Sequence, residues 1–362
     1  MADIEQAFPN VGVSQDHRDF LRFLWEDGNG ETITYRFLRV IVGLTSSPFL
    51  LNGTIRHHIE GYSSIDSNFV AQFIEDLYVD DVTTGCATVQ EGKVFYEKAM
   101  KRLSEAGFYL RKWVTNDPEL QRYFNSLSCA DKLEVENGDD ISYFEAQEGC
   151  VKHVNKNLKR VLGVGWNLDT DEFVFEFDNF LSKGTSDKLT KRDILSISAS
   201  LYDPLGFITP ITAYIKTIFQ MLCKNKLDWD DEVPNNIKVI WLEFMEGLKS
   251  VNPLKVKRIV NVSPVRNVKK VELHGFSDSS NLVYCAIVYL RLVCENDEVD
   301  VFFLSSKSKV APLKTLSIPR LELLGCTLLS KLLEEILFAV ESRIKIDEIY
   351  CWTDSKVALH WI

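Results

Sequence analysis

The chain has 362 residues, of which 46% are hydrophobic and 26% charged, and its formal net charge is −11. This length favours two or three domains over one, and the composition is typical of a globular protein and not of a disordered one. The acidic balance argues against a nucleic-acid binder, because phosphate contacts need lysine and arginine. However, an acidic segment at 131–148 and a basic segment at 252–271 show that the total conceals an uneven distribution of charge.

The eight cysteines are scattered, and no two of them form a C-x-x-C pair. This favours reduced thiols over a disulfide framework or a zinc site, and therefore an intracellular protein, cytoplasmic or nuclear. The N-terminus lacks the basic and apolar regions of a secretory signal, so we do not expect secretion. No uncharged apolar run approaches the ~20 residues that span a bilayer, so we expect no membrane partner.

Residues 1–125 alternate short apolar runs with amphipathic stretches, which predicts a domain of mixed strands and helices. Helices are predicted at Pro48–Ile59 and Val94–Leu103. Strands are predicted at Phe20–Trp25, Glu31–Val42, Phe73–Val82 and Gly107–Val114.

The polar stretch at 129–149 predicts a loop or an inserted flap, and Val161–Phe177 predicts a hairpin that turns at Asp169–Asp171. Three helices are then expected at about 189–202, 209–224 and 235–250, followed by a linker at Val262–Val268. Strands within 269–292, 299–306 and 347–353 and a long helix at 318–340 give the order β-β-β-α-β.

Asp80 and Asp81 interrupt an apolar strand pattern, and Asp3 lies close to the start of the chain. An Asp-Asp pair in a turn is usually solvated, but within an apolar strand two carboxylates are costly to bury without cations. Nucleotidyl transfer by two metal ions needs carboxylates from separate strands that meet at one point. The pattern therefore favours a metal site formed by these three residues.

A second set of acids lies in the last hundred residues. Asp278 lies in the middle of an apolar strand, Glu322 in the first turns of the long helix, and Asp354 at the end of a strand. Such residues can converge to hold two Mg²⁺ for the attack of water on a phosphodiester. Glu322 is also explained as an acid favoured by the helix dipole, and Asp354 with Ser355 as an N-cap pair. Asp278 is harder to explain without a function, because it interrupts an apolar strand.

Taken together, these motifs resemble the Pol polyprotein of Bel-Pao LTR retrotransposons. The segments that resemble motifs A to D of reverse transcriptases and the primer-grip strand are, in chain order, Asp3–Phe8, Gly43–Phe49, Tyr78–Asp81, Gly107–Trp113 and Val161–Asn167. The surroundings of Asp278, Glu322 and Asp354 resemble a ribonuclease H. Ser200–Phe207 and Ser317–Leu323 are similar to Bel-Pao sequences in particular.

The resemblance implies an α+β chain with four parts. They are a reverse transcriptase palm without fingers at 1–125, an acidic insertion and primer-grip-like hairpin at 126–178, a helical thumb/connection region at 179–262, and a C-terminally truncated ribonuclease H-like α/β domain at 263–362. The implied activity is that of an RNA-directed DNA polymerase with an associated ribonuclease H. The implied partners are an RNA template, a DNA primer, an RNA–DNA hybrid and deoxynucleoside triphosphates, whereas the oligomeric state stays open.

By the same resemblance, two Mg²⁺ or Mn²⁺ per site would be held by Asp3, Asp80 and Asp81 and by Asp278, Glu322 and Asp354. Phe8 would be the steric gate against a ribose 2′-hydroxyl, and Gly43 would allow close approach of the backbone. Tyr78 belongs to the substrate-binding motif, and Lys112 would contact the triphosphate or donate a proton. An ordinary turn glycine at Gly43 and a solvated lysine at Lys112 remain alternatives.

The fingers that precede motif A and the last helix of the ribonuclease H fold are not in the sequence. We therefore expect a fragment of a larger polyprotein that is itself inactive, and a non-catalytic segment that binds nucleic acid or protein stays open as an alternative. Phe8 counts against an RNA-dependent RNA polymerase. The basic segment Lys255–Lys270 is expected either to follow a nucleic-acid backbone or to be a soluble linker.

Overall fold

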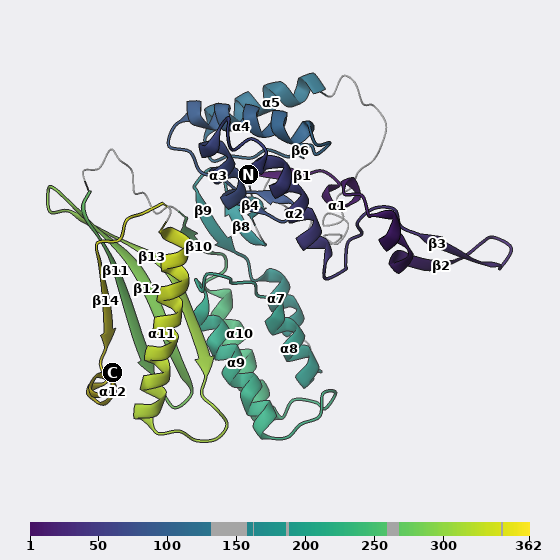
Figure 1. Ribbon diagram of the computed structural model, residues 1–362. Coiled ribbons are helices and arrows are strands. Elements are labelled where there is room, and N and C mark those ends of the chain that lie inside the picture. Colours follow the sequence, from purple (N-terminus) through teal and green to yellow (C-terminus); the bar gives the residue numbers. More distant parts are fainter. Residues whose placement is uncertain (132–157, 162, 186–187, 259–267, 342) are drawn as a thin grey trace. The chain divides into compact units, whose positions relative to one another are not determined.

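The computed structural model describes the chain except for residues 132–157, 162, 186–187, 259–267 and 342. The described residues form a mixed α/β structure with several sheets (Figure 1). The chain divides into two compact units, Met1–Val151 and Lys152–Ile362. No helix among the described residues is long and apolar enough to cross a membrane.

The first unit is built on a small four-stranded antiparallel sheet with the order β4-β5-β1-β6. Its strands are β1 (Ala2–Ile4), β4 (Leu77–Tyr78), β5 (Asp81–Val82) and β6 (Leu110–Arg111). The unit also contains α1 (Ala7–Asn10), a 3-10 helix (Gln15–Leu21), α2 (Ser47–Glu60), α3 (Ser67–Asp76), α4 (Val89–Ser104) and α5 (Pro118–Asp131). Fully buried side chains such as Leu51, Ile55 and Phe73 join these helices in one core.

The prediction of a single strand over Phe73–Val82 is wrong, because α3 continues to Asp76. The Asp66 side chain caps this helix by accepting a hydrogen bond from the backbone N–H of Phe69 (3.3 Å). Phe69, Val70 and Phe73 then bury one face of the helix. Only the end of the predicted strand remains extended, as β4 and β5, since a helical face with three buried residues outweighs a short alternating pattern.

Strands β2 (Arg22–Glu26) and β3 (Thr32–Arg36) form a separate hairpin that is shorter than the strands predicted there. Every residue of both strands is exposed. Phe23 and Tyr35 are paired in register, and their rings stack with centroids 5.8 Å apart. A two-stranded ribbon buries little surface by itself. The face of the hairpin that carries Phe23 and Tyr35 is therefore exposed.

The second unit begins with a four-stranded antiparallel sheet of order β10-β9-β8-β7. Its strands are β7 (Leu158–Val161), β8 (Val164–Asn167), β9 (Glu172–Phe175) and β10 (Leu254–Lys257). Strands β8 and β9 form the hairpin predicted at Val161–Phe177. Strand β10 overlaps the start of the basic segment Lys255–Lys270, which the sequence predicts to be a nucleic-acid-binding surface or a linker. Residues 259–267 of that segment lie outside the described residues.

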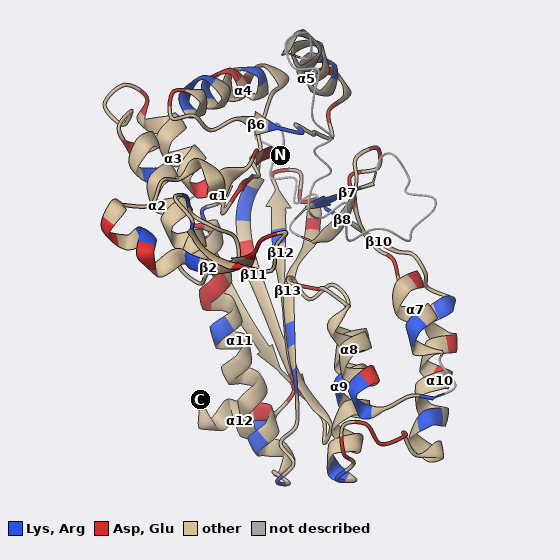
Figure 2. Ribbon diagram, turned by 90° about the vertical axis from the view of Figure 1, so that its right-hand side faces the viewer, with Lys and Arg blue, Asp and Glu red and all other residues tan. Residues whose placement is uncertain are grey.

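Four helices follow, α7 (Asp178–Gly184), α8 (Lys191–Ala199), α9 (Thr209–Lys224) and α10 (Asn235–Lys249). A capping box between Thr190 and Asp193 begins α8. Trp241 is fully buried at the centre of their core, and its indole N–H donates to the carbonyl of Gly184 (2.8 Å). Figure 2 shows acids and bases interspersed along α4 and α10, so neither helix carries charge of a single sign.

The last part of the unit is a sheet of order β13-β12-β11-β14 with a long helix on one face. Its elements are β11 (Val268–Ser279), β12 (Val283–Cys294), β13 (Val299–Val310), α11 (Ile318–Val340), β14 (Glu348–Thr353) and α12 (Lys356–Trp361). The first three strands are antiparallel, and β14 lies parallel to β11. Leu273, Leu290 and Leu332 are buried between sheet and helix. This is the β-β-β-α-β order that the sequence predicts.

The segment Asp203–Phe207 joins the helices to this sheet. The Asp203 carboxylate accepts backbone hydrogen bonds from Gly206 (3.0 Å), Phe207 (2.8 Å) and Ile208 (2.8 Å). The Ser306 hydroxyl on β13 donates to the carbonyl of Gly206 (2.7 Å). Gly206 has a φ of +83°, and a Cβ there would lie 2.1 Å from the Ser306 carbonyl oxygen, so only glycine fits this joint.

Candidate functional site

Three acids of the second unit meet at one edge of its large sheet. Asp278 lies near the end of β11, Asp354 directly follows β14, and Glu322 lies near the start of α11. Because β11 and β14 are parallel, with Ser277 opposite Thr353, their carboxyl ends reach the same edge. Carboxylate oxygens of the three acids all lie within 4.8 Å of one another. The structure thus brings together the second set that the sequence predicts.

The most buried acid of this set is Glu322, which is 6% exposed, whereas Asp278 and Asp354 are exposed. Burial raises the pKa of Glu322, and the nearby Ser279 hydroxyl lowers it in part. The negative charges of Asp354 and Asp278 raise it further. Glu322 Oε2 and Ser279 Oγ are buried atoms without a hydrogen-bond partner among the described residues. A buried, unpartnered carboxylate oxygen that faces two more carboxylates is an arrangement that a divalent cation would satisfy.

A hollow of about 410 Å³ adjoins this set of acids. It is lined by residues of β11, β12 and β14 and by the residue that follows β14: Phe276, Ser277, Asp278, Cys285, Ile287, Trp352, Thr353 and Asp354. The walls are largely apolar, and two of the three acids lie on the lining. The three acids therefore lie beside an apolar recess.

The first set of acids lies on the small sheet of the first unit. Asp3 on β1 pairs in register with Asp81 on β5, and the Asp80 carbonyl accepts a hydrogen bond from the Ile4 N–H (2.8 Å). Burial raises the pKa of Asp81 to about 6, and the charges of Asp80 and Asp3 contribute. Burial also raises the pKa of Asp3, with Lys112 opposing and Asp80 adding. The three carboxylates are therefore close enough to affect one another's charge.

The two sets nevertheless differ in geometry. Among the described residues, the group of acids, histidines or cysteines that converges closely enough for one ion is Asp278, Glu322 and Asp354. Asp3, Asp80 and Asp81 are neighbours by backbone register and electrostatics, without convergence of the same closeness.

Left-handed backbone conformations surround the first set. Gln6, Val79 and Lys112 have φ values of 45°, 56° and 55°, which are uncommon for residues other than glycine. Each lies just beyond the end of a strand of the small sheet, β1, β4 or β6, and such strained backbone is concentrated at functional sites. Lys112 is exposed, and its positive charge lowers the pKa of Asp3 against the effect of burial.

The other predicted residues of the first unit are placed as follows. Phe8 is half-buried on α1 and packs against the core, and Tyr78 is 62% exposed on β4. Gly43 has a φ of +98°, and no atom lies within 4 Å of the position where a Cβ would be. Its backbone conformation therefore explains the glycine without a close contact. Substrate-binding roles for these residues stay predictions.

Sequence reasoning missed the residues that line the hollow, notably Phe276, Ile287 and Trp352. The alternation along β11 could have placed Phe276 on the same face as Asp278. The other two depend on the register, which pairs Phe276 with Ile287 and with Trp352. Register between distant strands cannot be read from the pattern of one strand.

Residues 190–355 match the family model of the Pao retrotransposon-like RNaseH-like domain. No curated protein matches the sequence of the chain. Among solved structures, the chain is similar to a foamy viral protease-reverse transcriptase dRH in complex with ds DNA, with 15% sequence identity and a TM-score of 0.53.

That likeness covers 100% of this chain and 51% of the foamy viral chain, so this chain spans about half the length of the structure it matches. At this identity the likeness shows the fold alone, and it agrees with a mixed α/β architecture with several sheets. The family match is independent of it and covers the helices α8 to α10 and the sheet that carries Asp278, Glu322 and Asp354. Residues 190–355 are therefore similar to the Pao retrotransposon-like RNaseH-like domain.

Proposed function

We propose that Asp278, Glu322 and Asp354 form the active site of a metal-dependent ribonuclease H that cleaves the RNA strand of an RNA–DNA hybrid. The observation that carries this proposal is the convergence of the three carboxylates within 4.8 Å. The unpartnered, buried oxygen of Glu322 and the family match of residues 190–355 support it.

The residues present fit a divalent cation such as Mg²⁺ or Mn²⁺, because these cations prefer oxygen ligands, and the proposed site would hold two of them. When bound, they would lower the pKa of the attacking water and neutralise charge on the phosphodiester. Glu322 would hold its ligand oxygen rigidly from inside the fold, while the exposed Asp278 and Asp354 would face the substrate side. Because burial raises the pKa of Glu322, protons compete with metal at this residue.

The first unit would carry the palm of an RNA-directed DNA polymerase, with the helical region around α8 to α10 as thumb or connection. Asp3, Asp80 and Asp81 would hold two metal ions at the primer 3′-hydroxyl and the triphosphate. The register between Asp3 and Asp81 and the position of Lys112 beside Asp3 support this proposal. An RNA template, a DNA primer and deoxynucleoside triphosphates would be the partners.

The second candidate is a segment that binds nucleic acid or protein without polymerisation. The weaker convergence of Asp3, Asp80 and Asp81 and the bare aromatic face of the β2–β3 hairpin favour it for the first unit. Primer extension on an RNA template by residues 1–362 would exclude this candidate. Template binding without extension would support it.

The ribonuclease proposal is tested with the full 362-residue chain and a labelled RNA–DNA hybrid in Mg²⁺ or Mn²⁺. Asp278→Asn should lower the cleavage rate about 100-fold or more, because several kcal/mol of metal-based stabilisation are lost. A matched control is Asp297→Asn, which changes an exposed acid in the turn between β12 and β13. Equal cleavage by wild type and Asp278→Asn would refute the proposal.

A further inference from the structure

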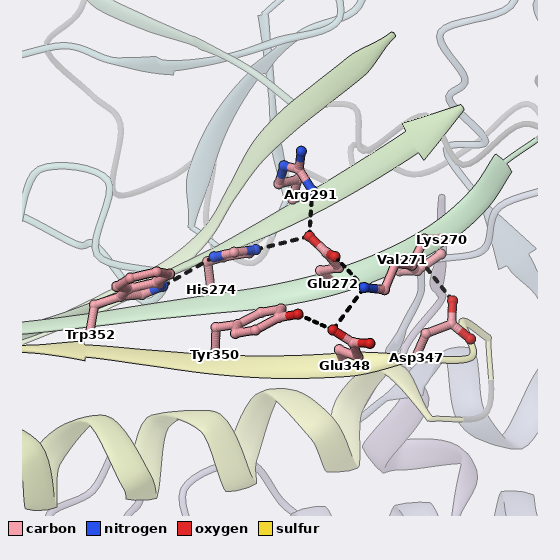
Figure 3. A network of polar contacts seen from close by, with 9 residues as sticks. All are labelled: Lys270, Val271, Glu272, His274, Arg291, Asp347, Glu348, Tyr350 and Trp352. Atoms are coloured by element: carbon pink, nitrogen blue, oxygen red, sulfur yellow. Dashed lines mark hydrogen bonds and ion pairs between the residues drawn. The ribbon is translucent and has the colours of Figure 1, made fainter. Parts of the chain in front are cut away.

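Trp352 on β14 is half exposed, yet a network of polar contacts fixes its orientation (Figure 3). Its indole N–H donates to Nδ1 of His274 (3.2 Å), and Nε2 of His274 lies 3.1 Å from Oε2 of Glu272. These partners require the His274 tautomer that carries its proton on Nε2. The tryptophan ring is thus tied through one histidine to a carboxylate inside the sheet.

Glu272 is a firm anchor for this chain of contacts. It is 5% exposed and makes ion pairs with Lys270 on the same strand (2.8 Å) and with Arg291 on β12 (2.5 Å). Lys270 also binds Glu348 on β14 (2.7 Å). A side chain held through such a network keeps its position without a ligand, which lowers the entropic cost of binding one.

The indole N–H is used within the protein, so the exposed part of Trp352 offers mainly its π surface. The ring is nearly parallel to that of Phe276, at an interplanar angle of 14° and a centroid distance of 6.2 Å. Phe276 is itself 41% exposed. Exposed rings without a free donor favour a flat, apolar partner that stacks over one that needs hydrogen bonds.

These rings line the hollow beside the acids. Phe276 and Asp278 lie two residues apart on β11, as do Trp352 and Asp354 at the end of β14. Two residues of a strand span about 6.7 Å, so a group on the rings lies roughly one nucleotide from the acids. The hollow has a volume of about 410 Å³ and is open to solvent.

We propose that Trp352 and Phe276 form a stacking wall for one nucleobase of the strand whose phosphodiester lies at Asp278, Glu322 and Asp354, and that His274 is a positioning residue for this wall. The proposal rests on the ribonuclease function proposed above. The acids attract a phosphodiester only through bound cations, whereas stacking on aromatic rings holds any base that is unpaired or extruded from the duplex, irrespective of sequence. The wall therefore adds affinity without sequence preference.

Binding is measured with the full chain and a fluorescein-labelled RNA–DNA hybrid by anisotropy, with Ca²⁺ in place of Mg²⁺. Trp352→Leu should weaken binding about tenfold, which lies within the usual range for loss of one stacked base. Trp352→Phe keeps a ring and should bind within about threefold of wild type. Phe338→Leu is the matched control, because Phe338 is 80% exposed on α11 away from the hollow.

A second arm separates stacking from general damage. Hybrids with an abasic site at each position of the RNA strand in turn should reveal one position at which wild type loses about tenfold in affinity. Trp352→Leu should show no further loss at that position. His274→Ala should reduce this abasic penalty, whereas a merely structural role would lower the unfolding temperature and leave the penalty unchanged.

The outcomes are distinguishable. Equal affinity of Trp352→Leu and wild type, or equal abasic penalties in both, overturns the stacking wall even if Asp278→Asn abolishes cleavage. Binding that depends on Trp352 without any cleavage by wild type would instead remove the ribonuclease proposal and leave the wall. A wild-type dimer that Trp352→Leu converts to a monomer would show that a second copy covers the rings, which also overturns the proposal.

Discussion

The two sets of acids are held by different architectures. In the first unit, Asp3 and Asp81 lie on strands of three and two residues, and residues in left-handed conformations shape the strand ends. In the second unit, Asp278 and Glu322 lie on a twelve-residue strand and a 23-residue helix that share a core. Long, well-packed elements fix where their ends lie, whereas very short strands depend on turns.

This difference explains why the second set converges more closely. Parallel strands β11 and β14 end at one edge, and α11 places Glu322 there from one face of the sheet. The first set lies around the β4–β5 turn, where Asp81 and Asp3 are partly buried and repel each other. The second set is thus built by the scaffold, and we expect the first set to need cations to draw it together.

The largest effect on stability should come from disrupting the ion pairs of Glu272 in the sheet that carries the second set of acids. Glu272→Gln should lower the free energy of unfolding by about 3 kcal/mol, because it removes the buried carboxylate that binds the partly exposed Lys270 and Arg291. Urea unfolding measures this. Glu335→Gln, which removes an exposed ion pair with Lys307, should change it by less than about 1 kcal/mol. Equal changes in the free energy of unfolding for the two variants would mean that the Glu272 network does not stabilise the sheet.

Stabilisation by Mn²⁺ should also differ between the two sets of acids. At a Mn²⁺ concentration of about 100 times the dissociation constant, the wild-type protein should gain about 2.7 kcal/mol of stability. Glu322→Gln should remove most of this gain and Asp3→Asn little of it, because the second set is preorganised. Calorimetric unfolding with and without Mn²⁺ measures both variants. The reverse order would contradict the proposed difference between the sets.

The first set of acids should make the stability of the protein depend on pH. The pKa of Asp81 is raised from 3.8 to about 6, so the folded state binds more protons than the unfolded state between these values. Stability should therefore fall as pH rises from about 4 to 6, by an amount on the order of 2 kcal/mol. Asp81→Asn should abolish this fall. A parallel pH profile for both proteins would disprove the assignment, and Mg²⁺ should reduce the fall in wild type.

The smallest effect concerns Lys112, whose charge lowers the pKa of Asp3 against its burial. Lys112→Met should raise the pKa of Asp3, because the opposing positive charge is lost. Carboxyl chemical shifts of Asp3 as a function of pH measure this. Lys101→Met, at an exposed position on α4, is the control and should leave the Asp3 titration unchanged.

Much of the second unit could be predicted because its patterns are long. The alternation in β11 and β12 and the helical period of α11 each extend over many residues, and their elements have the predicted types. The prediction of a strand over Phe73–Val82 was wrong because Phe73 belongs to two patterns. It lies in an apolar run that is typical of a strand, and it also shares a buried helical face with Phe69 and Val70. Helix α5 was not predicted, and β10 pairs with β9, which lies about 80 residues earlier in the chain.

The sequence by itself determined which acids are candidates, since Asp80, Asp81 and Asp278 interrupt apolar patterns where an unpaired carboxylate is costly. Only the tertiary structure decided that Asp278, Glu322 and Asp354 converge while the first set stays looser, and that Trp352 lies beside His274 and Phe276. The physical reason is that residue type and period depend on neighbours along the chain. Distances between carboxylates and between rings depend instead on strand register and helix packing, which arise when distant segments share a core.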